Sequence, residues 1–412
     1  MRFINLLYSL LLLDFTSQIA YQNVYNYFYF MDAKRYNNIK LGVGIGKAVV
    51  SFLLILLFVW WGYSVQLESF AASYFDDKYL VFLLFTFLIG IGASVLFAPI
   101  NFYTGFYLEH KYELSNQTFY KWVWENFKGS LVSIVIGVPI MLLFYFTMNQ
   151  FGSLWWLPFA IIMFFVSVVL SQIFPVIILP LFHKITPLDN EELKSKIDKL
   201  ANDAGIRVEN IYRFDMSKNT KKANAALTGL GKTKRIILGD TLIDKYSNEE
   251  IETVIAHELG HYKRKHIIKN ILIGTASSFL TLFLISYLYE VSLEAFGFAS
   301  ITQIAALPLL ALWSMLIGVI QTPLGNILSR KYEYEADEFA VKETGLAQQF
   351  VSTLEKITVQ NLGDKEPHPF VEWFFYSHPS IKNRVDAILT FAKVNNIVSP
   401  ISDENSLSLQ SN

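Results

Sequence analysis

Residues 251–266 read IETVIAHELGHYKRKH and contain the pattern H-E-x-x-H in His257, Glu258 and His261. Residues four apart lie on one face of a helix, so the two imidazoles can bind the same metal ion. Glu258 lies beside them, in the position of a general base for hydrolysis. The stretch therefore predicts a zinc-binding helix, although the same three residues also occur by chance in ordinary helices.

The composition is that of a membrane protein with a substantial polar part. The 412 residues are 53% hydrophobic and only 17% charged, whereas soluble domains average about 25% charged. A net charge of −1 gives no reason to expect a nucleic-acid partner. The chain has no cysteine, which excludes disulfides and thiolate-bound zinc and leaves histidine and carboxylate as metal ligands.

Seven apolar segments are long enough to cross a bilayer. They lie near residues 3–20, 43–65, 79–107, 130–148, 154–182, 267–289 and 303–326. We expect a mainly α, multi-pass membrane protein with seven transmembrane helices and a small zincin-like α+β catalytic domain. The predicted division is 1–182 for spans one to five, 183–266 for the first catalytic part, 267–328 for spans six and seven, 329–396 for the second catalytic part, and 397–412 for a disordered tail.

The first polar segment shows helix and strand patterns before the zinc motif. Residues 190–204 have the periodicity of an amphipathic helix, and residues 210–216, 223–228 and 235–238 read as short strands. Ser247 and Glu250 form a capping box, which predicts the start of the motif helix.

Lysine and arginine gather in the segments on one side of the predicted spans. The segments after spans one and three contain Lys34, Arg35, Lys40, Lys111, Lys121 and Lys128, and both polar catalytic segments are also basic. The opposite loops hold few such residues. The positive-inside rule then predicts an N-terminus outside the cell and a cytoplasmic catalytic domain and C-terminus.

A catalytic zinc site needs a third protein ligand and an open position for water. Glu333 and Asp337 are four residues apart in the acidic run after the last span, on one face of the predicted helix. Glu333 can bind the metal while Asp337 accepts the free N–H of a ligand imidazole. The alternative is that the acidic run is a solvated helix face, as charge runs usually are.

The sequence AHELGH, followed 72 residues after His261 by EYEADEFA, resembles the type I CaaX prenyl endopeptidases. These integral-membrane zinc peptidases trim prenylated C-terminal tripeptides. The resemblance extends to PINFYTGFYLE at 99–109, LPLFHKITPL at 179–188, NAALTGLGKTKRIILGDTL at 224–242 and SHPSIKNR at 377–384. In the family the spans enclose a large water-filled chamber, and the catalytic site faces its interior.

The resemblance implies that one Zn²⁺ per chain is bound by His257, His261 and Glu333. It implies that Glu258 is the general base and that Asp337 supports a ligand imidazole. The remaining histidine of this segment, five residues after His261, would be rotated off the ligand face of a continuous helix, and we expect it to be structural.

Two late residues match the last family motif. The resemblance implies that His378 steadies the oxyanion of the tetrahedral intermediate, and that Arg384 belongs to the same site. From the residues alone, His378 could equally be a turn residue before a proline, and Arg384 a charge on a helix surface.

We expect a peptide or protein substrate to bind extended beside an edge strand, with Asn224, Ala225 and Ala226 as the residues it pairs with. The family predicts a lipidated C-terminus on that substrate and a bilayer around the enzyme. The short chain and its ending, SLQSN, favour a bacterial inner (cell) membrane over the endoplasmic reticulum membrane.

Other classes of protein share parts of this pattern. A quality-control metallopeptidase of the HtpX kind shares H-E-x-x-H and a later glutamate but has fewer spans before the motif. A seven-span transporter or receptor with an incidental metal site would not need Glu258. An inactive protease-like adaptor would lack a ligand or the base, and none is missing here.

Overall fold

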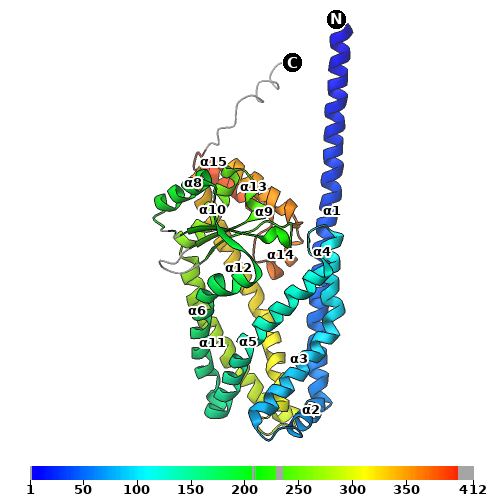
Figure 1. Ribbon diagram of the computed structural model, residues 1–412, viewed down its shortest axis with the longest axis vertical. Helices are drawn as coiled ribbons and strands as arrows, with labels where there is room; N and C mark the ends of the chain where they lie inside the picture. Colours follow the sequence, from blue (N-terminus) through cyan, green and yellow to red (C-terminus); the bar gives the residue numbers. More distant parts are fainter. Residues whose placement is uncertain (1, 207, 209, 229–234, 398–412) are drawn as a thin grey trace.

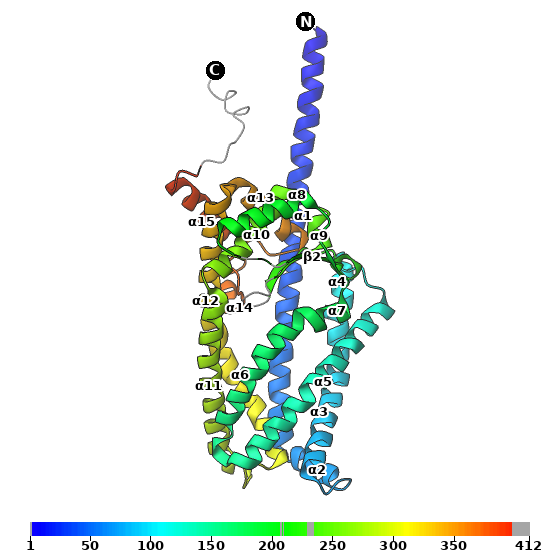
Figure 2. The same cartoon turned by 60° about the vertical axis from the view of Figure 1, so that its left-hand side comes forward.

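The structure is a computed structural model that describes residues 2–206, 208, 210–228 and 235–397. Long helices form an open bundle, and a small domain of helices and strands lies at one end of it (Figures 1 and 2). The predicted tail lies outside the described residues, apart from residue 397. The arrangement confirms the expected fold class of a helical membrane bundle with an α+β domain.

The bundle consists of α1 (Arg2–Trp60), α2 (Tyr63–Ala72), α3 (Lys78–Phe102), α4 (Leu108–Lys111), α5 (Phe119–Phe151), α6 (Trp156–Ile173), α7 (Leu179–Phe182), α11 (His266–Ser292) and α12 (Pro308–Thr344). Within the described residues, six helical stretches are long and apolar enough to cross a membrane. They are Phe30–Trp60, Lys78–Lys111, Phe119–Leu154, Trp156–Phe182, His266–Ser292 and Ile304–Thr344. The predicted number of seven spans is therefore not confirmed.

The difference lies in α1, which is one continuous helix across both of the first two predicted spans. The charges that suggested a loop between them remain helical, because lysine and arginine are good helix formers. Lys40 pairs with Glu109 at 2.8 Å, which anchors this part of α1 beside α4. The start of α1 lies on the same side of the bundle as the catalytic domain (Figure 1), so the predicted outside N-terminus is not confirmed either.

The catalytic domain consists of β1 (Ile185–Pro187), α8 (Glu191–Asp203), β2 (Asn210–Phe214), β3 (Ala225–Thr228), β4 (Arg235–Gly239), α9 (Asp240–Ile243), α10 (Asn248–Lys263), α13 (Ala347–Gln360), α14 (Pro369–Phe375) and α15 (Ile381–Val394). The strand order in the sheet is β1-β2-β4-β3, with β2 and β4 parallel and the outer pairs antiparallel. The three predicted strands are present, and β3 lies at one edge of the sheet. Strand β1 was not predicted.

The described residues form three clusters of buried hydrophobic side chains, and the two largest lie in different parts of the molecule. One lies in the catalytic domain, where α8, α10 and α13 pack around the sheet and bury Ile197, Ile236 and Phe350. The other lies at the end of the bundle away from that domain, around Phe85 and Tyr289. The helices therefore meet at the two ends of the bundle, while their middle stretches contribute few buried residues to either core.

The loop between α4 and α5 connects the bundle to the catalytic domain just before β3. The Asn116 amide donates to the carbonyl of Asn219 at 3.1 Å, and the Lys221 amide donates to the carbonyl of Leu114 at 3.0 Å. From the other side, the Asn361 side chain accepts a hydrogen bond from the Ala223 amide at 2.8 Å. The backbone that leads into the edge strand is thus held by both the membrane bundle and α13.

Candidate metal centre

Helices α10 and α12 cross closely enough to bring the sequence-distant ligands together. Gly260 lies at the crossing, where an added Cβ would be 3.0 Å from the Cα of Ala336 and 3.1 Å from the Cβ of Phe339. Only glycine allows this approach without a shift of the helices. Ser247 caps α10 with Glu250 in the predicted capping box, which fixes where the helix begins.

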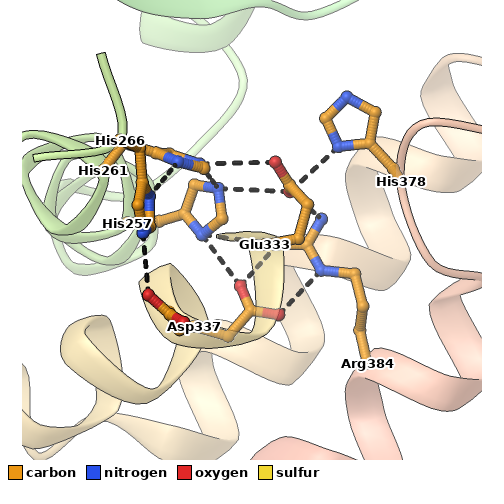
Figure 3. A network of polar contacts seen from close by, with 8 residues as sticks. His257, His261, His266, Glu333, Asp337, His378 and Arg384 are labelled. Atoms are coloured by element: carbon orange, nitrogen blue, oxygen red, sulfur yellow. Dashed lines mark hydrogen bonds and ion pairs between the residues drawn. The ribbon is translucent and has the colours of Figure 1, made fainter. Parts of the chain in front are cut away.

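His257, His261 and Glu333 present ligand atoms that all lie within 4.8 Å of one another. The Nε2 atoms of the two histidines are 3.2 Å apart, and Glu333 approaches His261 at 3.3 Å and His257 at 3.5 Å (Figure 3). Two imidazoles and a carboxylate brought this close together are a set of groups that could hold a metal ion.

The carboxylate of Glu333 supports this interpretation. It is buried, and among the described groups its Oε2 atom has no hydrogen bond of good geometry. His378 lies 2.9 Å from this oxygen and Arg384 lies 3.5 Å from it, and a carboxylate buried in this way needs cationic groups beside it. The residues present therefore fit a bound divalent metal ion.

Asp337 contacts the side of the His257 ring that faces away from the other two candidate ligands. The Nδ1 atom of His257 lies 2.8 Å from Oδ1 of Asp337, which leaves Nε2 free to face the other ligands. Burial lowers the pKa of His257, but the carboxylates of Asp337 and Glu333 raise it by more, to about 9. Metal and proton therefore compete for this imidazole at neutral pH.

Arg384 lies behind the same carboxylate and is not a surface charge. Its side chain is 11% exposed, and its Nε donates to Oδ2 of Asp337 at 2.8 Å. Burial lowers the pKa of Arg384, and the carboxylate of Asp337 outweighs this effect and raises it. Arg384 thus keeps Asp337 in place and neutralises its charge.

His378 reaches the site from the loop between α14 and α15. Its Nδ1 lies 2.9 Å from Oε2 of Glu333, while 65% of the side chain is exposed (Figure 3). The sequence left open whether His378 is a site residue or only a turn residue before a proline. A turn residue fits this position poorly, because the imidazole points at the candidate ligand Glu333. The ring borders both the ligand cluster and open space.

Glu258 is half-buried on α10, one residue after His257. Its charge adds to those of Asp337 and Glu333, which together outweigh burial and raise the pKa of Arg384. On the other side, β3 packs next to α10 and carries Ala225 and Ala226, while the Asn224 carbonyl accepts the Gly239 amide at 3.0 Å. The structure brings the edge strand and the motif helix together.

Sequence reasoning missed two residues of the site. One is the buried His266, whose Nδ1 lies 3.0 Å from Nδ1 of His261. The other is Glu335, whose Oε2 lies 2.9 Å from Nε2 of His266. We expected this histidine to face away, because a continuous helix would rotate it. The helix is not continuous: Lys265 adopts a left-handed conformation with φ of 59°, which ends α10 and starts α11.

Comparisons with known proteins agree with this geometry. Residues 187–392 match the model of peptidase family M48, and residues 19–184 match that of the CAAX prenyl protease N-terminal region with five membrane helices. The CAAX prenyl protease 1 of Saccharomyces cerevisiae is 32% identical, over 70% of this chain and 68% of its own length. An uncharacterized metalloprotease, YhfN of Bacillus subtilis, is 31% identical over 86% of this chain and 84% of its own.

A solved structure has the same fold. The crystal structure of Ste24p from S. mikatae superposes with a TM-score of 0.78 at 27% identity, and the match covers 87% of this chain and 89% of that one. The match to CAAX prenyl proteases over both the bundle and the catalytic domain favours this family over the HtpX alternative. The chain belongs to peptidase family M48 and, within it, to the membrane metalloproteases related to the CAAX prenyl proteases.

Proposed function

We propose that this metalloprotease uses one Zn²⁺, bound by His257, His261 and Glu333, to cleave peptides near a lipidated C-terminus. The observation that carries the proposal is the convergence of these three ligands, whose ligand atoms all lie within 4.8 Å of one another around the buried carboxylate of Glu333. Two imidazoles and one carboxylate, without sulfur, are a ligand set typical of catalytic zinc.

The proposed reaction follows from the positions of the side chains. When bound, the metal would polarise the scissile carbonyl and lower the pKa of a water molecule. Glu258 takes the proton from this water as it attacks, and then delivers it to the leaving amine. His378 borders the ligand cluster from the exposed side, where its N–H can donate to the developing oxyanion.

We infer that the substrate binds as an added strand along β3, through the backbone of Asn224, Ala225 and Ala226. Strand β3 is at the edge of the sheet and lies against the motif helix. A cavity of about 670 Å³ between α6 and α11 reaches Leu227 on this strand, and Ser171 and Asn270 are among the polar residues that line it. We propose that a peptide reaches the edge strand from the bundle through this cavity.

The proposed location is a bacterial inner (cell) membrane with the catalytic domain in the cytoplasm, the endoplasmic reticulum membrane being the alternative. The basic segments around Lys34 and Lys121 lie on the side of the catalytic domain, where Lys222 donates to Tyr36 and Lys121 donates to the carbonyl of Lys218, as the positive-inside rule predicts for a cytoplasmic face. We also propose that the chain is divided into membrane spans up to residue 182, catalytic parts at 183–266 and 329–396, and further spans between these two parts.

The test is a peptidase assay with a farnesylated C-terminal peptide and the same peptide without the lipid. Wild type, Glu258→Gln, Glu333→Ala and the exposed control Glu338→Gln are purified in detergent, and the metal content of each is measured. We expect Glu258→Gln to keep its zinc but lose about 10²–10⁴-fold in rate. Glu333→Ala should lose the zinc, and Glu338→Gln should match wild type.

Wild-type rates in Glu258→Gln would contradict the proposed base, and full zinc in Glu333→Ala would contradict the ligand set. A protein that cleaves both peptides equally well would contradict the lipidated substrate, but not the peptidase.

A further inference from the structure

The break between helices α10 and α11 brings His266 into contact with the candidate metal ligand His261. Lys265 has φ of 59° and ψ of 30°, a left-handed conformation that is unfavourable for a non-glycine residue. Its effect is to turn the chain so that His266, the first residue of α11, faces back to His261. The two Nδ1 atoms are 3.0 Å apart.

The contacts of these two rings allow one consistent set of proton positions. His261 turns its Nε2 toward Glu333, so this nitrogen must be free of a proton to bind metal, and Nδ1 carries the hydrogen. That hydrogen is donated to Nδ1 of His266, which must then be an acceptor. The proton of His266 therefore lies on Nε2, which donates to Oε2 of Glu335 at 2.9 Å.

The second ring is itself held firmly. His266 is 2% exposed and stacks on the ring of Tyr332, with centroids 4.1 Å apart and planes 10° from parallel. Tyr332 and Glu335 are three residues apart on α12, so one turn of that helix supplies both the stacking surface and the acceptor. Lys269 lies 3.8 Å from the carboxylate of Glu335 and lessens the cost of its charge.

We propose that His266 and Glu335 are positioning residues, which fix the tautomer and orientation of His261 through a chain of two hydrogen bonds. The inference rests on the metal site proposed above. Asp337 supports His257 directly, whereas the support of His261 passes through one further imidazole. The same helix, α12, thus contributes the third ligand and the final carboxylate behind each histidine ligand.

The test separates hydrogen bonding from packing by two substitutions at one position. His266→Phe keeps a flat ring against Tyr332 but has no acceptor for His261. His266→Asn loses the ring but retains an amide oxygen close to the place of Nδ1. Full-length variants are loaded with Co²⁺, and its affinity is measured by chelator competition, together with its visible absorption spectrum.

We expect His266→Phe to weaken Co²⁺ binding about 10–100-fold and to change the spectrum, while His266→Asn stays within about threefold of wild type. The reverse order, with Phe equal to wild type and Asn impaired, would show that the ring only packs and would overturn the proposal. Thermal unfolding of the metal-free variants establishes that each one is folded.

A double-mutant cycle tests whether Glu335 acts through the imidazole. Glu335→Ala alone should weaken Co²⁺ binding, and in the His266→Phe background it should have no further effect. Additive losses would overturn the proposed chain, because they would mean that Glu335 acts on the site by its charge alone. Wild-type protein that binds no Co²⁺ would overturn the metal site itself, and this inference with it.

Discussion

Replacing Gly260 by alanine tests whether the close crossing of α10 and α12 sets the metal geometry. The new Cβ would meet the Cα of Ala336 at 3.0 Å, and its carbonyl oxygen and the Cβ of Phe339 at 3.1 Å, where ordinary contact begins at 3.4 Å. The two helices must therefore separate by about 0.3–0.4 Å. Two of these neighbours are backbone atoms, which cannot move aside as the end of a flexible side chain can.

The expected effect on stability is small, because two terms oppose each other. Overpacking costs about 1–3 kcal/mol, while alanine in a helix interior is more favourable than glycine by about 1 kcal/mol. The effect on metal binding is larger, since ligand distances tolerate only about 0.2 Å of error. His261 lies one residue from Gly260 and Glu333 lies one helical turn from Ala336, so the separation acts on the distance between these two ligands.

We expect Gly260→Ala to unfold within a few degrees of wild type but to bind Co²⁺ at least about tenfold more weakly, a loss of about 1.4 kcal/mol. Chelator competition measures the affinity, and thermal unfolding of the metal-free protein measures the stability. The matched control is Gly318→Ala in α12, where an added Cβ meets no atom within 4 Å. Wild-type affinity in Gly260→Ala would refute the argument that the crossing sets the ligand distances.

Two further predictions concern His257 and its partner. Because the pKa of His257 is raised to about 9, metal affinity should fall about tenfold for each pH unit below 9 and level off above it. The same shift stabilises the metal-free protein below the unfolded pKa of 6.5, and this stability is lost as the pH rises through 9. Affinity that is constant between pH 7 and 9 would contradict this competition. Asp337→Asn should weaken metal binding about 10–100-fold, since the amide places a donor against His257 or Arg384. Glu338→Gln, on the exposed face of the same helix, is the control, and equal affinities in the two variants would rule out the support by Asp337.

The sequence predicted those parts of the molecule that depend on local pattern. Apolar length located the membrane helices, and the capping box located the start of α10. Period-two runs located β2, β3 and β4, but β1 has only three residues and no room for such a pattern. The loop predicted at Lys34 and Lys40, between the first two spans, is helical in the structure, and the number of seven spans is not confirmed. Charges interrupt an apolar pattern without interrupting a helix, so hydropathy alone cannot separate a loop from a basic helical segment.

The contacts of His266 could not be predicted for a different reason. Periodicity assumes a continuous helix, and a single residue in the left-handed region changes the direction of every residue after it. Lys265 gives no signal of this kind, because lysine is a good helix former and the left-handed conformation favours glycine or asparagine. The break exists because the tertiary structure requires α11 to enter the bundle while α10 packs on the sheet.

The acidic run of α12 carried a signal that separates ligands from solvated charges. Glu333, Ala336, Asp337 and Ala340 follow the spacing i, i+3, i+4, i+7 of one helix face, and all four are at most 4% exposed. Alanines between acids at this spacing indicate a face that another helix approaches closely, and Gly260 is the residue that approaches it. An acid on such a face loses water and needs a cation or a donor in its place. Glu338 lies off the face and is exposed, so small residues at helical spacing, rather than the number of charges, identify the two acids that face α10 directly.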